Sequence, residues 1–154
     1  MFKPTRIICH GSASLFGDAK MIDGWHRQRG FDGIGYHGVI LNGHRTARSG
    51  YNDKLDGKIE PGRPESRQGA HCAAGGMNRV ALGVCLIGDS TKRAYTDRQI
   101  AALVHWLATM CQRYGIPPSR ITQHSDHDRG KPHCAGLDMP DIRRRVAARL
   151  AGTE

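Results

Sequence analysis

The stretch from Ala81 to Ile87 constrains the fold more than any other part of the chain. It is the most apolar segment, with Asn78 before it and Gly88-Asp89 after it. A short apolar run between turn-forming residues is typical of a strand buried in the centre of a sheet. We therefore predict a central buried strand at this position.

The clearest helix follows this strand. Thr96 and Gln99 have the spacing of a capping box, which is a signature of a helix start. Gly115, followed by Pro117 and Pro118, predicts the helix end. Between these signals the apolar residues recur at helical spacing, and they are Ile100, Leu103, Val104, Leu107, Cys111 and Tyr114.

Shorter elements alternate along the rest of the chain. We predict strands at residues 6–9, 34–41, 58–60 and 121–123, a helix that Asp18 caps and Gly30 closes, and a last helix that starts at Pro140. The 154 residues are enough for one domain but too few for two comfortable ones. The sequence therefore predicts a single α/β domain over residues 1–154 with a mixed sheet.

The strand at 34–41 carries two detailed predictions. Alternation of side chains places Tyr36 with Ile40 on one face and His37 with Val39 on the other. Asn42-Gly43 directly after it favours a hairpin turn. The Gly-, Pro- and charge-rich segment that follows indicates surface loop with one edge strand.

The chain carries a formal net charge of +9, which implies an anionic partner. A nucleic-acid partner is disfavoured, because the basic residues are dispersed and only 6% of residues are aromatic. The basic last helix suggests contact with anionic envelope lipids, the alternative being a solvated outer face on a packed helix. Its arginines are Arg143, Arg144, Arg145 and Arg149, around an inner stripe of Ile142, Val146 and Leu150.

The sequence shows neither a secretory signal nor a membrane-spanning segment, and our expectation of its localisation rests on this. The first ten residues have no long apolar run of a secretory signal, and no stretch approaches the roughly 20 apolar residues of a spanning helix. We therefore expect synthesis in the cytoplasm, where thiols stay reduced, so the five cysteines should not form a disulfide framework. We expect a monomer.

Two histidines fall at the ends of predicted strands. His10 ends the first strand, His124 follows the strand at 121–123, and Cys134 comes shortly after in a polar loop. Two imidazoles and one thiolate suit zinc, and three protein ligands leave a fourth position open for water, as in catalytic sites. Spacing alone leaves ordinary loop residues as the alternative, and His127 and His133 are rival ligands.

A series of short motifs covers most of the chain. They are Ile7-Ile8-Cys9-His10-Gly11-Ser12-Ala13, Trp25-His26, Gly35-Tyr36-His37, Gly69-Ala70-His71, Asn78 with Leu82-Gly83-Val84-Cys85-Leu86-Ile87-Gly88, and His124-Ser125-Asp126 ahead of Lys131 and Cys134. In this order and spacing the chain resembles the zinc N-acetylmuramoyl-L-alanine amidases, which include a coliphage lysozyme, cytosolic anhydro-muropeptide amidases and animal peptidoglycan recognition proteins. The resemblance implies a central mixed sheet flanked by helices.

The resemblance also implies one zinc ion held by His10, His124 and Cys134. Tyr36 matches a tyrosine beside the metal, to which we assign orientation of the water and relay of a proton. Lys131 matches a lysine beside the metal, to which we assign stabilisation of the oxyanion.

His71 and Asn78 match positions in the family's substrate groove, the alternative being polar turn residues. The chain departs from the family where Lys131 lies three residues before Cys134, since the family usually has the lysine two before, where Pro132 stands here. Cys85 and Cys134 stand where the cytosolic branch has acidic residues. The phage-lysozyme branch is therefore the nearer one.

We expect a peptidoglycan amidase that cuts between the lactyl-muramoyl group and L-alanine, acting as a phage or prophage endolysin once the membrane is permeabilised. Four alternatives stay open. They are a non-catalytic peptidoglycan-binding module, a cytosolic muropeptide-recycling amidase, a Cys-His hydrolase with Cys134 or Cys72 as nucleophile, and a nucleic-acid binder.

Overall fold

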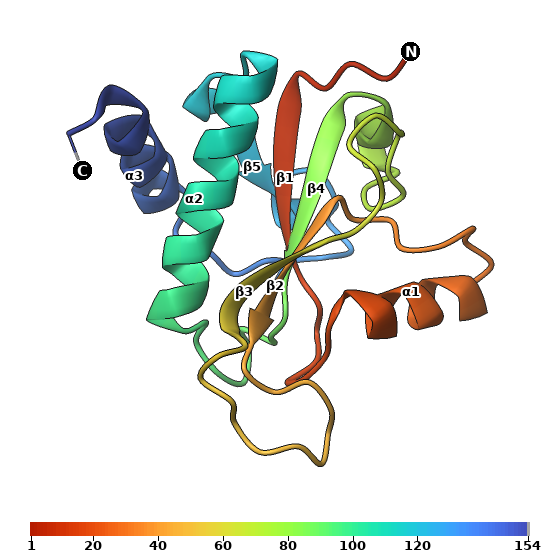
Figure 1. The fold of residues 1–154 in the computed structure, drawn as a ribbon. Helices are drawn as coiled ribbons and strands as arrows, with labels where there is room; N and C mark the ends of the chain where they lie inside the picture. Colours follow the sequence, from red (N-terminus) through yellow and green to blue (C-terminus); the bar gives the residue numbers. More distant parts are fainter. Residues whose placement is uncertain (154) are drawn as a thin grey trace.

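A five-stranded sheet forms the centre of the computed structural model, which describes residues 1–153 (Figure 1). The strands are β1 (Arg6–Gly11), β2 (Gly38–Asn42), β3 (Asp56–Pro61), β4 (Ala81–Leu86) and β5 (Ile121–Gln123), in the order β3-β2-β4-β1-β5. β2, β4, β1 and β5 pair in parallel, and β3 pairs antiparallel at one edge. The predictions of a mixed sheet and a central buried β4 are confirmed.

Three helices cover the two faces of this sheet. They are α1 (Ala19–Gln28), α2 (Asp97–Tyr114) and α3 (Met139–Ala151), and the short 3-10 helices are η1 (Ala74–Arg79), η2 (Pro118–Arg120) and η3 (His124–Asp126). α2 and α3 lie together on one face, and α1 lies on the other (Figure 1). The capping box of Thr96 and Gln99 forms as predicted, and Gly115 ends α2 in the left-handed conformation. Within residues 1–153, none of the helices combines the length and the apolar character needed to cross a bilayer.

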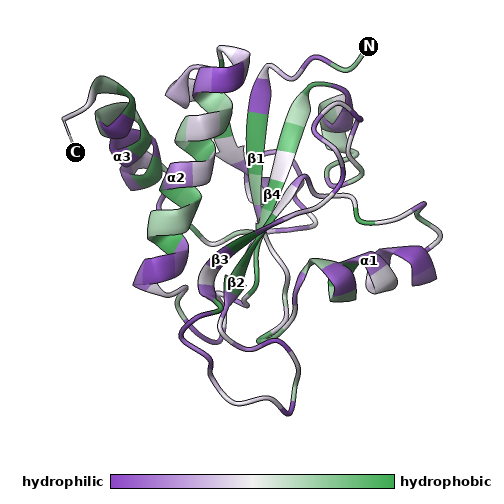
Figure 2. Ribbon diagram, in the orientation of Figure 1, coloured by the Kyte–Doolittle hydropathy of each residue, from purple (hydrophilic) through white to green (hydrophobic). Residues whose placement is uncertain are grey.

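β4 is buried because apolar groups cover it on both sides. Val84 and Leu86 pack into the larger cluster with α2 and α3. Cys85 and Ile87 pack into a smaller cluster with Ile22 of α1. In Figure 2 most of β1 is coloured as hydrophobic, whereas hydrophobic and hydrophilic residues alternate along α2.

The strand predicted at 34–41 begins only at Gly38, so that prediction was wrong for its first four residues. Gly35 lies so close to another segment that an added Cβ would stand 2.0 Å from the Ala70 carbonyl oxygen. The Tyr36 carbonyl accepts from the Arg63 N–H rather than from a neighbouring strand. As a result Tyr36 packs with the cluster of Val39, and the predicted pairing with Ile40 is also wrong.

Two smaller predictions failed as well. Asn42-Gly43 does not form a tight hairpin, because a long loop over residues 43–55 separates β2 from β3. The Asn42 side chain instead donates to the Leu15 carbonyl and accepts from the His44 N–H. Leu150, expected on the inner stripe of the last helix, is 41% exposed. All five cysteines are free, as predicted.

Candidate metal centre

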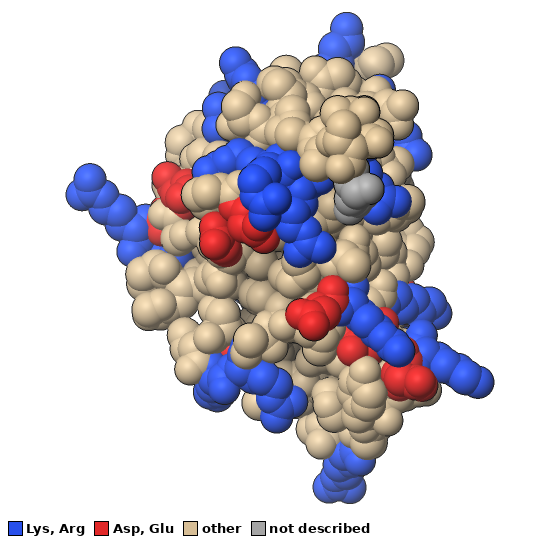
Figure 3. Space-filling view, turned by 90° about the vertical axis from the view of Figure 1, so that its left-hand side faces the viewer, with Lys and Arg blue, Asp and Glu red and all other residues tan. Residues whose placement is uncertain are grey.

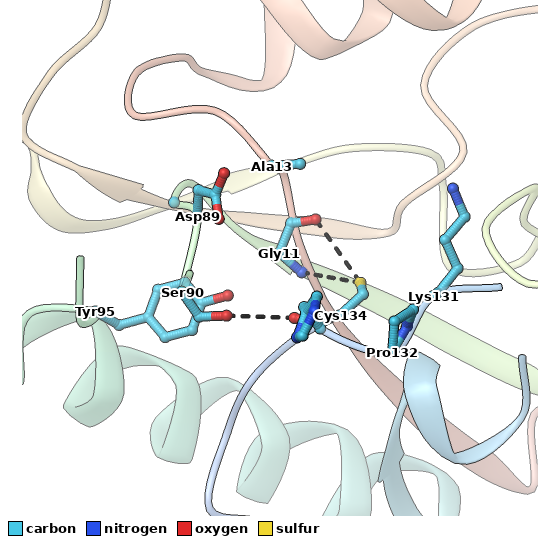
Figure 4. A pocket seen from close by; sticks show the side chains of 10 residues that line it. Gly11, Ala13, Asp89, Ser90, Tyr95, Lys131, Pro132 and Cys134 are labelled. Carbon is cyan, nitrogen blue, oxygen red and sulfur yellow. Dashed lines mark hydrogen bonds between the residues drawn. The ribbon is translucent and has the colours of Figure 1, made fainter. Parts of the chain in front are cut away.

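The three predicted ligands meet where two neighbouring parallel strands end. His10 lies near the end of β1, and His124 comes directly after β5. Cys134 reaches the same place from the loop before α3, and Gly11 N–H donates to its Sγ (Figure 4). The ligand atoms of the three residues all lie within 4.8 Å of one another.

The separations of these atoms fit a tetrahedral zinc ion. Usual Zn–N and Zn–S bond lengths place two imidazole nitrogens about 3.3 Å apart, and a nitrogen and a sulfur about 3.6 Å apart. The Nδ1 atoms of His10 and His124 are 3.1 Å apart, and Cys134 Sγ lies 3.9 Å from His10 Nδ1. Two nitrogens and one sulfur are also the donor set that zinc prefers.

The rival histidines do not join this cluster. His127 Nε2 lies 2.7 Å from the Thr122 hydroxyl, and His133 is exposed. Within residues 1–153, His10, His124 and Cys134 are the single group of metal-binding side chains found.

His10 is completely buried, and a second histidine lies behind it. His10 Nε2 is 2.9 Å from His71 Nδ1, and His71 Nε2 is 3.1 Å from the Ala81 carbonyl oxygen. Burial, followed by the neighbouring histidines, holds the pKa of His10 well below its usual range. Burial lowers the pKa of His71 to about 3. Both rings are therefore neutral at neutral pH, as metal ligation requires of His10.

His124 and Cys134 are less enclosed. His124 Nε2 is a buried nitrogen without a hydrogen-bond partner in the described part of the chain, and the Asp128 carboxylate is 3.6 Å away. Burial lowers the pKa of His124 despite that carboxylate. Burial raises the pKa of the Cys134 thiol, while the Gly11 N–H and Lys131 oppose the rise. A bound divalent ion favours the thiolate strongly.

Tyr36 lies beside the cluster. Its ring centroid is 5.0 Å from that of His10 and 5.3 Å from that of His26. Burial and the nearby Cys85 hold the pKa of Tyr36 well above its usual range. The phenol therefore stays protonated and can donate a hydrogen bond at neutral pH.

Two cavities adjoin the cluster and share Cys134 and Lys131 in their walls. The larger, of about 540 Å³, also includes Tyr36, His71, Asn78 and His124. The smaller, of about 180 Å³, extends past Cys134 toward Asp89 and Tyr95 (Figure 4), and His133 also lines it. Lys131 is exposed and lines both cavities.

His71 and Asn78 are occupied within the protein although they line the larger cavity. Both ring nitrogens of His71 have partners in the chain, as described above. The Asn78 side-chain oxygen accepts from the backbone N–H groups of His71 and Cys72, at 2.8 Å each. Their predicted contact with substrate stays a prediction.

The same cavity contains residues to which the sequence analysis gave no role. They are His26, Arg29, Phe31 and Asp128. The Arg29 guanidinium lies 5.3 Å from the centre of the Phe31 ring and places a cation at the cavity wall. Arg29 stands at the C-cap of α1, where a loop begins, and loops carry binding residues more often than the elements that they connect, so this position was the available signal.

Comparison with known proteins shows which family this chain belongs to. Residues 2–136 match the protein family described as N-acetylmuramoyl-L-alanine amidase. The endolysin of Escherichia phage T7 is 32% identical over 120 residues, which is 75% of this chain and 67% of that protein. The endolysin of Enterobacteria phage T3 is 30% identical over the same shares.

Solved structures share the fold. N-acetylmuramoyl-L-alanine amidase LysC from Clostridium intestinale URNW superposes with a TM-score of 0.79 at 26% identity, covering 95% of this chain and 87% of that one. Drosophila PGRP-LB superposes with a TM-score of 0.67 at 20% identity, covering 98% and 81%. At that lower identity the likeness concerns the fold alone.

Proposed function

The chain belongs to the N-acetylmuramoyl-L-alanine amidase family, and on that premise we propose that it cleaves its substrate as a zinc enzyme whose ligands are His10, His124 and Cys134. Its activity is hydrolysis of the amide bond between N-acetylmuramic acid and L-alanine in peptidoglycan. The convergence of two imidazoles and one thiol within 4.8 Å supports the zinc site.

The residues around the cluster have chemistry that suits amide hydrolysis. When bound, zinc supplies the Lewis acidity for attack at neutral pH. The protonated Tyr36 hydroxyl orients the attacking water and relays a proton toward the leaving amine. The Lys131 ammonium, in the wall of both cavities, stabilises the negative charge that develops on the carbonyl oxygen.

Release of new L-alanine amino termini from purified peptidoglycan tests this proposal. The protein is assayed as prepared, after chelator treatment, and after zinc is added back. We expect loss and recovery of activity. Activity that survives complete metal removal would instead support Cys134 or Cys72 as a nucleophile. Binding of the polymer without release of amino termini under any metal condition would support a binding module.

We propose host-cell lysis as the biological role, because two phage endolysins are among the relatives. The enzyme would be made in the cytoplasm and reach the wall after the membrane is permeabilised. The alternative is muropeptide recycling. Comparison of kcat/KM on polymeric peptidoglycan and on soluble anhydro-muropeptides separates the two, since a lytic enzyme should prefer the polymer.

We also propose that α3 contacts anionic envelope lipids. Arg144 supports this, because its side chain is 72% exposed even though it forms an ion pair with Asp141. Arg143 is instead directed inward, where it donates to the Ile121 carbonyl. Figure 3, which faces the side where α2 and α3 lie, shows acidic side chains among the basic ones. Replacement of Arg144 and Arg145 by glutamine should lower activity on intact envelopes and spare purified peptidoglycan, and equal loss on both substrates would contradict the lipid contact.

A further inference from the structure

We propose that His71 is a positioning residue that fixes the tautomer and the orientation of His10. The inference rests on the proposed zinc site and adds to it a residue that lies outside the group of proposed ligands. It also gives a reason for a glycine in the most apolar strand of the sheet.

The argument begins at a backbone carbonyl. A carbonyl oxygen can only accept, so the His71 nitrogen 3.1 Å from Ala81 O, Nε2, must carry the hydrogen. In a neutral imidazole the other nitrogen, Nδ1, is then an acceptor. His10 Nε2 lies 2.9 Å from that acceptor and must donate to it.

The hydrogen on His10 Nε2 determines which His10 nitrogen can bind metal. With Nε2 protonated, His10 Nδ1 carries the free lone pair, and Nδ1 is the atom that lies 3.1 Å from His124 Nδ1 and 3.9 Å from Cys134 Sγ. Metal-binding histidines generally donate their second N–H to a partner that fixes the ring. Here the partner is another histidine, itself fixed by the backbone of β4.

The backbone packs closely around the His71 ring. Gly83 interrupts the apolar strand β4, and a Cβ added there would lie 2.6 Å from two atoms of that ring. A Cβ added at Gly69 would also lie 2.6 Å from it. A glycine inside a strand often marks a close approach by another group. The Asn78 side chain holds the His71 backbone N–H at 2.8 Å. The His71 ring is thus held in place by the hydrogen bond of its backbone N–H, by the glycines packed against it, and by the contacts of both its nitrogens.

Zinc affinity, measured by competition with a chromogenic chelator, tests the inference on the full chain. His71→Leu removes the acceptor, and we expect zinc to bind about 10- to 100-fold more weakly, as is usual when the partner of a metal-binding histidine is lost. His71→Asn places an oxygen near the position of Nδ1, and we expect it to recover most of the affinity.

His37 offers a matched control. It is buried, accepts from the Gly83 N–H through Nδ1, and lies 2.8 Å from the Arg67 carbonyl through Nε2. Its ring centroid lies 6.0 Å from that of His71, but it has neither a hydrogen bond nor a ring contact with His10. His37→Leu should lower the melting temperature and leave zinc affinity unchanged. Equal loss of affinity in the two leucine variants, or unchanged affinity in His71→Leu, would overturn the positioning role.

A measurement without substitution covers the case in which the variants do not fold. Imidazole 15N shifts of the metal-free wild type should show His10 as the Nε2–H tautomer. The Nδ1–H tautomer would overturn the inference even if zinc binds. A wild type that takes up no zinc would overturn the proposed metal site itself, and the inference with it.

Discussion

His10 approaches the proposed metal centre from inside the sheet, whereas His124 and Cys134 approach it from the loop that follows β5. The sheet half consists of His10 on β1 and His71 behind it, and β1 pairs with both β4 and β5. The loop half consists of residues 124–136, which follow the three-residue strand β5 and contain no helix longer than the three residues of η3. Each half supplies at least one of the proposed ligands.

The two halves are held in place by different forces. The sheet half depends on burial, because His10, Ile8 and Gly83 lie among fully or nearly fully buried neighbours. The loop half depends on local hydrogen bonds, such as that from Ser125 N–H to the Cys134 carbonyl, at 2.6 Å. The difference teaches that the sheet half fixes one proposed ligand rigidly, while the loop half places the other two, together with the exposed Lys131, beside an open cavity.

The largest expected effect comes from removal of one proposed ligand from each half, which should lower activity in both cases but lower stability in only one. Both His10→Ala and Cys134→Ser should lower kcat/KM by about 10²- to 10⁴-fold, because the proposed zinc ion would contribute several kcal/mol of transition-state stabilisation. Only His10→Ala should also lower the free energy of unfolding of the metal-free protein, since it leaves a cavity in the sheet. Activity assays and urea denaturation measure the two effects. Equal destabilisation by both substitutions would contradict the conclusion that burial holds only the sheet half.

Lys131→Met tests whether a residue of the loop half contributes to catalysis without contributing to stability. We expect kcat to fall by about 10²-fold, which is typical for loss of an oxyanion donor. Zinc content and melting temperature should not change, because Lys131 is exposed. Steady-state kinetics beside zinc analysis checks this. A parallel fall in zinc content would show that Lys131 acts through the ligand Cys134 instead.

Gln123→Ala tests the hydrogen bonds that hold the loop half. The Gln123 side-chain oxygen accepts from the backbone N–H groups of Ala135 and Leu137. Loss of this acceptor should cost about 1–3 kcal/mol of unfolding free energy. Gln112→Ala, at an exposed position of α2, is the matched control and should be near neutral. Urea denaturation compares the two, and similar values would refute the importance of this contact.

The smallest effect concerns acid and the histidines near the sheet. Burial is the main cause that lowers the pKa values of His26 and His37 below their ordinary 6.5. The unfolded chain therefore binds more protons than the folded chain below about pH 6.5, so stability is full above that pH and falls as pH decreases toward the folded-state values.

Urea denaturation of the metal-free protein at pH 7.0 and pH 5.5 measures the slope of the unfolding free energy against pH. Each histidine contributes at most about 1.4 kcal/mol per pH unit. His37→Gln should make the slope shallower. A slope unchanged by this substitution would show that acid acts elsewhere, for example on the loop half.

Much of the fold could be predicted because its signals are local. The apolar run of β4 and the capping box at Thr96 depend on residues close in sequence, and both predictions are confirmed. The start of β2 depends on the distant Ala70, which approaches Gly35 and which no local pattern reveals. The turn at Asn42-Gly43 failed for a similar reason, since the Asn42 side chain bonds to Leu15 instead of supporting a hairpin.

The site shows the same division. The convergence of His10 and His124 follows from parallel strands that end at one edge, which the alternation of elements could suggest. The contact between His10 and His71 could not be predicted, because it depends on the exact path of the segment before η1. Gly83 carried a readable signal, since a glycine inside an apolar strand often indicates that another group approaches the backbone.

The separation of the ligands along the chain has a consequence for the timing of synthesis. His10 and Cys134 are 124 positions apart. A ribosome makes the chain from its amino terminus, so His10 emerges long before its partners, and β5 must join the sheet before His124 is in position. If the proposed zinc site is right, metal capture comes among the last events in the production of each molecule, and a chain that ends before Cys134 lacks one of the three proposed ligands.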